Sequence, residues 1–146
     1  MEDSMMTNDK MRDHRLTMAN EDYLEAIYRI SIDQDNPEVR SVDIAELLDV
    51  SKASVSKALN TLRDEGYVEQ SRYGKVNLTE EGVNYASDLW RCHRMLRVFL
   101  TEDLGIDYDT ANEEACLMEH AISLNTMRAW MDFLEKNHKE NGKEQF

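Results

Sequence analysis

The stretch "DIAELLDVSKASVSKALNTLRDEGYV", residues 43–68, decides the fold of this 146-residue chain. Its apolar residues recur at intervals of three and four, the spacing of helices that bury one face. Ser51 is a predicted N-cap inside the stretch, and Gly66 ends the second helical pattern. Two short helices joined by a tight turn have the proportions of a helix-turn-helix. The residues predicted to face inward are Ile44, Ala45, Leu47, Leu48, Val50, Val55, Leu59 and Leu62.

The segments on either side extend this pair of helices into a winged helix. Downstream, "YVEQ" and "KVNLT" are separated by "SRYG", residues 71–74, and this pattern predicts a β-hairpin. Upstream, an amphipathic helix is predicted with Asn20 as its N-cap, and it ends before Pro37. Ser41 is predicted to cap the first helix of the pair. The order of helix, helix-turn-helix and hairpin is that of a winged helix, in which the hairpin is the wing.

The rest of the chain is predicted to be helical. Thr79 is a predicted cap for a long helix that runs to about Leu100, and two further helices are predicted near residues 109–123 and 125–138. We therefore predict a mainly α protein, in which a winged helix-turn-helix domain precedes a small all-helical domain. About 60 residues are close to the lower limit for an independent core, so this second domain is predicted to dimerise. The predicted boundaries are 1–17 for a frayed N-terminus, 18–84 for the winged helix, 85–138 for the helical domain and 139–146 for a tail.

The charge of the chain is strongly acidic but unevenly distributed. A formal charge of −13 argues by itself against nucleic acid, because neutralisation of phosphates by Lys and Arg dominates such binding. Residues 1–39 hold ten acids and four bases, and residues 82–146 hold twelve acids and seven bases. By contrast, the segment from Val50 to Arg63 holds three bases and no acid, and the segment from Gln70 to Leu78 adds two more bases without an acid. A small basic surface is therefore predicted within an acidic protein.

This basic surface coincides with the second helix of the pair and with the wing. Small hydroxyl side chains and Lys at a helix N-terminus suit the major groove of DNA and its phosphates. The alternative is an exposed amphipathic helix pair in a protein–protein module, and it leaves the acid-free segment unexplained. The residues predicted to contact double-stranded operator DNA are Ser51, Lys52, Ala53, Ser54, Ser56, Lys57, Asn60, Arg72 and Lys75.

The sequence predicts a cytoplasmic protein without a membrane partner. No run of 18 apolar residues is present, and the N-terminus lacks the basic start and apolar centre of a secretory signal. The two cysteines, Cys92 and Cys116, are accordingly predicted to be reduced thiols.

A second motif, "EACLMEHAIS" at residues 114–123, predicts a metal site. Cys116, Glu119 and His120 stand at i, i+3 and i+4, so the three side chains share one face of a helix. Each has an ordinary alternative: a buried Cys behaves as a small hydrophobe, a lone His is usually a hydrogen-bonded core residue, and a lone Glu is usually solvated. Together, beside a core, they favour a shared ligand, because a buried Glu needs a partner.

Two other predicted helices offer further candidate metal ligands. His93 lies among apolar neighbours on the long helix. Asp22 and Glu25, at i and i+3 on the first helix, share a face, although taken singly they would be acids that complement the helix dipole. A mixed set of carboxylates, imidazoles and one thiolate suits a first-row divalent ion.

The ordered set of motifs resembles the diphtheria toxin repressor family of metal-dependent transcriptional repressors, in particular its short manganese transport regulator branch. "EDYLEAIYRI" is similar to the first helix of the family, residues 43–68 to its helix-turn-helix, and "EACLMEHAIS" to its metal-ligand helix. The likeness runs from residue 19 to about residue 135. It implies a non-enzymatic repressor that binds operator DNA as a homodimer when loaded with metal, and that controls manganese or iron uptake genes. The ligands it implies are Asp22, Glu25, His93, Cys116, Glu119 and His120.

The chain departs from both branches of the family. The manganese branch often has Glu where this chain has Cys116, whereas the iron-responsive branch has Cys there but Met where this chain has Asp22. Iron-type members also use an acid and a histidine where this chain has Arg97 and Asn112, which argues against a second metal site of the iron type. The carboxylates favour Mn²⁺ as the cofactor, whereas sulfur ligation by Cys116 would favour Fe²⁺, Co²⁺ or Zn²⁺.

Two other classes of protein stay open at this point. One is a winged-helix regulator that senses a small organic ligand in a pocket lined by Trp90, Met95, Met118, Met127 and Trp130, residues that more often form core. The other is a metalloenzyme, but the sequence has no Gly-rich phosphate loop and no nucleophile–base pair with an orienting third group.

Overall fold

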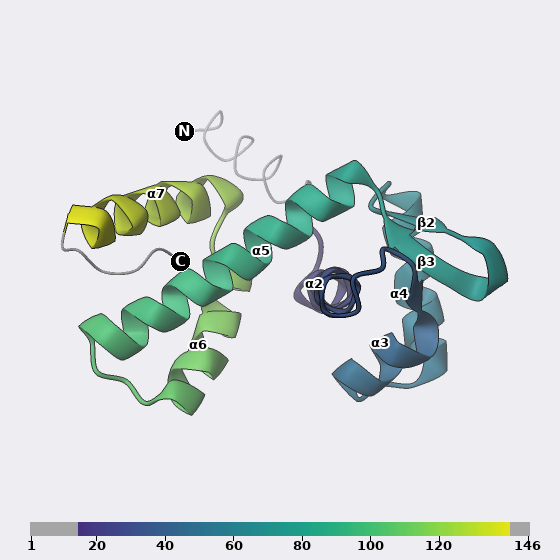
Figure 1. Ribbon diagram of the computed structural model, residues 1–146, viewed down its shortest axis with the longest axis horizontal. Helices are drawn as coiled ribbons and strands as arrows, with labels where there is room; N and C mark the ends of the chain where they lie inside the picture. Colours follow the sequence, from purple (N-terminus) through teal and green to yellow (C-terminus); the bar gives the residue numbers. More distant parts are fainter. Residues whose placement is uncertain (1–14, 141–146) are drawn as a thin grey trace, which may run out of the picture. The chain divides into compact units, whose positions relative to one another are not determined.

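The computed structural model describes residues 15–140, and the chain divides there into two compact units (Figure 1). One unit spans Leu16–Asp88, and the other begins at Leu89 and includes Arg15. The predicted frayed N-terminus, residues 1–17, lies outside the described residues except for its last three positions. The predicted tail, 139–146, lies outside except for its first two residues, which continue a helix. Among residues 15–140, no helix has the length and apolar character needed to span a membrane.

The first unit contains the predicted helix-turn-helix. Helix α2 spans Met18–Asp33 and packs against both helices of the pair, α3 (Ser41–Leu48) and α4 (Lys52–Asp64). Ile44, Val55 and Leu62 are fully buried between them. Asp49, which follows α3, has a φ of 53° and so makes the tight turn in a left-handed conformation, which Asp tolerates better than most residues.

Two of the residues predicted to face inward do not. Leu47 is 45% exposed and Val50 is 36% exposed, so this part of the prediction is wrong. Helix α3 has only eight residues, and its buried stripe is centred on Ile44 and Ala45. At about 100° per residue, Leu47 lies nearly a third of a turn from the centre of that stripe. Val50 follows the helix and belongs to the turn.

Two of the predicted helix caps also differ. Thr17, not Asn20, caps α2, because the Thr17 hydroxyl accepts a hydrogen bond from the Asn20 N–H at 3.2 Å. Ser41 is the first residue of α3 rather than its cap. The cap predicted at Ser51 is confirmed, since its hydroxyl accepts from the Ser54 N–H at 3.1 Å. A polar residue near the start of a helix indicates an N-cap. The sequence does not show which of several nearby residues has the extended backbone conformation of the cap.

The predicted hairpin is present and belongs to a three-stranded antiparallel sheet. The order is β1 (Val39–Arg40), β3 (Lys75–Leu78) and β2 (Val68–Gln70). The two-residue strand β1 was not predicted, because so short a segment carries no alternation of polar and apolar residues.

Arg63 joins helix α4 to the wing. Its guanidinium donates to Gln70 Oε1 on β2 at 2.6 Å and to Asn60 Oδ1 on α4 at 2.5 Å. The helix that presents the predicted DNA contacts and the base of the wing are therefore held together by one side chain.

Helix α5, Glu80–Val98, begins immediately after the wing and is capped by Thr79 as predicted, because the Thr79 hydroxyl accepts from the Gly82 N–H. Gly82 allows a very close approach here. A Cβ at this position would lie 2.1 Å from the carbonyl oxygen of Tyr67, which already accepts from the Thr79 N–H at 3.0 Å. The start of α5 is thereby set directly against the backbone that leads into the wing.

Tyr85 holds a buried carboxylate in the same unit. Its hydroxyl donates to Glu21 Oε2 at 2.5 Å and accepts from the Leu16 N–H at 3.0 Å, and Glu21 is only 1% exposed. A buried carboxylate that loses a donor keeps its desolvation penalty without the compensating hydrogen bond.

We expect Tyr85→Phe to lower the free energy of unfolding by about 2 kcal/mol, the usual worth of a hydrogen bond to a charged group. Urea unfolding followed by circular dichroism measures it. Tyr73→Phe, which removes a hydroxyl from an exposed ring, is the matched control and should change stability by less than about 0.5 kcal/mol. An equal effect of the two variants would contradict the role given to the Tyr85 hydroxyl.

The second unit is helical, as predicted. It comprises the rest of α5, a single turn of π-helix over Phe99–Asp103, α6 (Tyr108–Ala121) and α7 (Leu124–Glu140), with α6 and α7 beside the second half of α5 (Figure 1). Asp107 caps α6, and hydrogen bonds from the backbone and hydroxyl of Thr110 hold the pKa of its carboxyl below the usual range. The fully buried core includes Leu89, Met95, Leu96, Ala115 and Met127. Met95 and Met127, which the organic-ligand alternative places around a pocket, are therefore core residues.

Candidate metal centre

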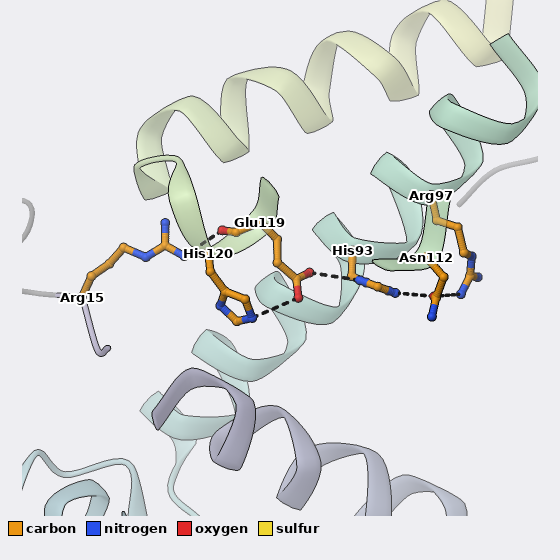
Figure 2. Close-up of polar contacts among 6 residues, drawn as sticks. All are labelled: Arg15, His93, Arg97, Asn112, Glu119 and His120. Atoms are coloured by element: carbon orange, nitrogen blue, oxygen red, sulfur yellow. Dashed lines mark hydrogen bonds and ion pairs between the residues drawn. The ribbon is translucent and has the colours of Figure 1, made fainter. Parts of the chain in front are cut away.

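The second unit brings three of the predicted ligands together around one carboxylate. Glu119 on α6 is fully buried, and its side chain lies between two imidazoles (Figure 2). Oε2 is 3.6 Å from Nδ1 of His93 on α5, and Oε1 is 3.4 Å from Nε2 of His120. The imidazole side chains are almost completely buried as well. Each oxygen of one carboxylate thus faces a different ring nitrogen.

The imidazole of His93 is oriented by a hydrogen bond at its other ring nitrogen, Nε2. Nε2 of His93 is 2.8 Å from Oδ1 of Asn112, and Nη1 of Arg97 lies 3.5 Å from the same oxygen (Figure 2). A guanidinium can only donate, so the atom of Asn112 that faces both residues is the acceptor. In the neutral imidazole, Nε2 of His93 then carries the proton and the lone pair of Nδ1 is directed at Glu119. The Trp90 ring stacks on the imidazole of His93, with 5.4 Å between the two ring centroids, and this contact helps to hold the plane of the imidazole.

The geometry fits a divalent cation. Separations of 3.4 and 3.6 Å exceed those of normal hydrogen bonds. Two donors on a divalent ion with bonds of about 2.1 Å are about 3.4 Å apart at the tetrahedral angle. A histidine that donates its other ring proton to an amide oxygen is also the usual arrangement of a metal ligand, because that bond sets the tautomer. The donor atoms, their spacing and the neutral tautomer of His93 are thus all suited to a divalent cation.

The other predicted ligands are distributed between the two units. Cys116 is half-buried and precedes Glu119 and His120 by one turn of α6. Asp22 and Glu25 belong to the winged-helix unit, where they lie one turn apart on α2, with Glu25 buried and Asp22 half-buried.

Two further residues contact this cluster, and neither was among the predicted ligands. Asn112, one turn before Cys116 on the same helix, orients His93; the sequence marked it only as the position where iron-type members have a histidine. Arg15 donates from Nη2 to the backbone carbonyl of Glu119 at 2.8 Å, within the last turn of α6, where a cation complements the carbonyls of a helix end (Figure 2). Arg15 lies in the stretch predicted to be frayed, so nothing in the sequence pointed to it.

The predicted DNA-contacting residues lie on the surface of the first unit. Ala53 and every predicted polar residue of α4 are exposed, and Val55, Ala58 and Leu59 turn inward between them. On the wing, Arg72 is exposed and Lys75 is half-buried. The hydroxyls of Ser51 and Ser54 are 2.9 Å apart at the start of α4. These residues present hydroxyl groups and positive charge from adjoining parts of one unit.

We expect Asn112→Ala to lower the affinity for Mn²⁺ by about 10- to 100-fold, because His93 then loses the bond that sets its tautomer. Competition with a metal-binding dye measures the affinity. Asn112→Asp, which keeps an acceptor for the His93 proton, is the matched variant and should bind within a few-fold of the native protein. The interpretation would be wrong if the alanine variant bound Mn²⁺ like the native chain.

Both units resemble domains of known proteins. Residues 15–76 match a family model for the N-terminal DNA binding domain of the iron dependent repressor, and residues 79–145 match its metal binding and dimerisation domain. The chain is 36% identical over 121 residues to an uncharacterized HTH-type transcriptional regulator of Methanocaldococcus jannaschii, covering 83% of this chain and 96% of that one. It is 32% identical over 117 residues to the transcriptional regulator MntR of Salmonella typhimurium, covering 80% and 73%.

A solved structure is similar as well. The manganese regulator SloR superposes with a TM-score of 0.64 at 32% identity, covering 78% of this chain and 54% of SloR. The chain therefore spans about half the length of that solved regulator, but almost the whole of the archaeal relative.

Proposed function

The chain belongs to the iron-dependent repressor family, and we propose that it represses transcription by binding operator DNA as a homodimer when loaded with a divalent metal ion. The observation that carries the proposal is the buried Glu119 carboxylate between two imidazoles, one of which has its lone pair directed at that carboxylate by Asn112. Buried charged groups in proteins are paired or coordinate metals, and a carboxylate with two imidazoles is a common ligand set for a divalent ion.

The ligands we propose are the six predicted from the sequence. Nδ1 of His93 and Nε2 of His120 lie 3.6 and 3.4 Å from the oxygens of the Glu119 carboxylate in the helical unit, which supports these three residues as ligands. Cys116, Asp22 and Glu25 would complete the set. Because each Glu119 oxygen faces a different imidazole, the carboxylate can serve one ion or two. A bound divalent cation supplies the positive charge that lets the carboxylates approach the imidazole nitrogens.

Metal binding would act on DNA through α2. This helix carries Asp22 and Glu25 and packs against α3 and α4, the two helices of the DNA-binding pair. Ligation by both acids would fix α2 to the helical unit and thereby restrict the two copies of α4 in a dimer. Two-fold recognition requires half-sites at a defined separation, so restriction raises affinity. The coupling is reciprocal, and DNA should tighten metal binding by the same factor.

We propose Mn²⁺ as the physiological ion, because three carboxylates are hard ligands and because SloR, at 32% identity, is a manganese regulator. Fe²⁺ is next, and Co²⁺ or Zn²⁺ would bind through Cys116 if its sulfur ligates. A repressor of this kind would control manganese or iron uptake genes and act in the cytoplasm, where the DNA is.

The test uses a 30-base-pair duplex selected from a random library by the Mn²⁺-loaded protein. Fluorescence anisotropy then gives the affinity for that duplex with Mn²⁺ and with a chelator. We expect the chelator to weaken binding by about 100-fold, the upper end of typical allosteric coupling. Equal affinity with and without metal would refute the proposal, and sedimentation of the complex shows whether two chains bind one duplex.

A further inference from the structure

The tip of the wing carries an exposed aromatic residue. Tyr73 is 95% exposed, more than any other large apolar or aromatic residue in the described part of the chain. It lies between Arg72 and Gly74 in the turn that joins β2 and β3. The Lys75 N–H donates to the Arg72 carbonyl, and the Ser71 N–H donates to the Lys75 carbonyl at 2.7 Å, so the turn is held by its own backbone.

Tyr73 is also in an unfavourable backbone conformation. Its φ is 64° and its ψ is 32°, and Gly74, which follows, has a φ of 73°. Hairpin turns with two successive positive φ values favour Asn, Asp or Gly at the first position, and a bulky residue there is a rare outlier. A tyrosine at this position destabilises the turn, and its exposed ring recovers almost nothing by packing. Strain of this kind in an exposed turn points to a binding role.

The surroundings of Tyr73 indicate the partner. Arg72 is exposed beside it, and Lys75 follows two residues later. Through Gln70 and Arg63 the base of the same hairpin is hydrogen-bonded to α4, whose outer face carries the predicted major-groove contacts. A positively charged hairpin fixed beside such a helix would meet the DNA backbone and the adjoining minor groove.

We propose that Tyr73 is a DNA-contacting residue, whose ring packs against the sugars lining the minor groove next to the base pairs contacted by α4, while Arg72 contacts a phosphate. This inference rests on the proposed function, because it requires that the chain binds duplex DNA. It adds an apolar contact with the DNA sugars, which neither the basic residues nor the metal supply.

The first experiment needs no variant. The Mn²⁺-loaded native protein is treated with tetranitromethane with and without the selected duplex, and nitration of each tyrosine is quantified by peptide mass spectrometry. Tyr108, in the helical unit, is 59% exposed and serves as the internal control. We expect DNA to slow nitration of Tyr73 at least fivefold and to leave Tyr108 unchanged. Equal nitration of Tyr73 in the free and bound protein would overturn the contact.

The second experiment separates binding from folding. Tyr73→Asn places a residue that suits a positive φ, so the melting temperature should stay the same or rise. Its affinity for the duplex should fall about tenfold, and hydroxyl-radical footprinting should lose protection in the flanking minor groove. Tyr73→Phe, which keeps the ring, should bind within twofold of the native chain. If native protein binds the duplex only with Mn²⁺ but Tyr73→Asn binds equally well, the wing contact is refuted and the proposed function stands.

Discussion

Replacing Glu119 with glutamine should abolish metal-dependent DNA binding, with a loss of Mn²⁺ affinity on the order of 100-fold or more. The change keeps the shape of the side chain and removes its charge. Glu119 is the residue toward which His93 and His120 both converge, so the amide weakens the site on both sides. An amide nitrogen would also face one of the two imidazoles in place of an oxygen that can bind a cation. Dye competition and anisotropy with the selected duplex measure the two losses.

The same substitution should change the stability of the metal-free protein far less than it changes metal affinity. Glutamine has nearly the volume of glutamate, so it fills the buried position without a cavity or overpacking, and the melting temperature should stay close to the native value. Glu114→Gln, at an exposed acid of the same helix, is the matched control and should alter neither metal nor DNA affinity. A Glu119→Gln protein that binds Mn²⁺ within threefold of the native chain would show that the metal is bound elsewhere.

Gly82→Ala should be the most damaging conservative change in the winged-helix unit. The added Cβ would lie 2.1 Å from the Tyr67 carbonyl oxygen and 3.3 Å from Cδ2 of Leu78. A backbone carbonyl that already accepts from the Thr79 N–H cannot move without breaking that bond. We expect a loss of about 3 kcal/mol in the free energy of unfolding, the upper range for overpacking, and a melting temperature lower by on the order of 10 °C.

The control for this prediction lies two residues further along α5. Asn84 is exposed, and alanine has the higher helix propensity, so Asn84→Ala should raise stability by a few tenths of a kcal/mol. If Gly82→Ala were as stable as Asn84→Ala, the close contact between the start of α5 and the wing would not exist in solution. A selective loss of DNA affinity at unchanged stability would contradict the steric argument as well.

The winged helix could be predicted because its information is local. Each helix of residues 43–68 repeats its apolar positions several times, and turn residues bound the hairpin at 71–74. The errors in the predicted fold occur in elements that are too short for their apolar pattern to repeat. Helix α3 has only two turns, so the spacing of Leu47 did not distinguish the centre of the buried face from its edge. Strand β1 has two residues and is defined only by its pairing with β3.

For the candidate metal centre, too, the residues with a local signal could be predicted and those that depend on distant contacts could not. Cys116, Glu119 and His120 could be selected because their spacing places them on one face of a helix. The contribution of Asn112 and Arg15 could not be predicted, because each depends on a contact with a residue far away in the sequence, His93 in one case and the Glu119 carbonyl in the other. Spacing along one helix predicts donors, but it contains no information on which nitrogen of a histidine carries the proton.

The bridge made by Arg63 bears on which base pairs the protein prefers. Reading adenine with an asparagine requires the amide to accept from N6 and donate to N7 at once. In this chain, however, the amide oxygen of Asn60 is already held by the guanidinium of Arg63. That oxygen has a second lone pair, so an adenine N6 would have to share it with Arg63, whereas the Asn60 NH₂ group stays available to acceptors such as N7 and O6 of guanine or O4 of thymine. The side chain that steadies the wing would thereby also weaken the preference of α4 for adenine at this position.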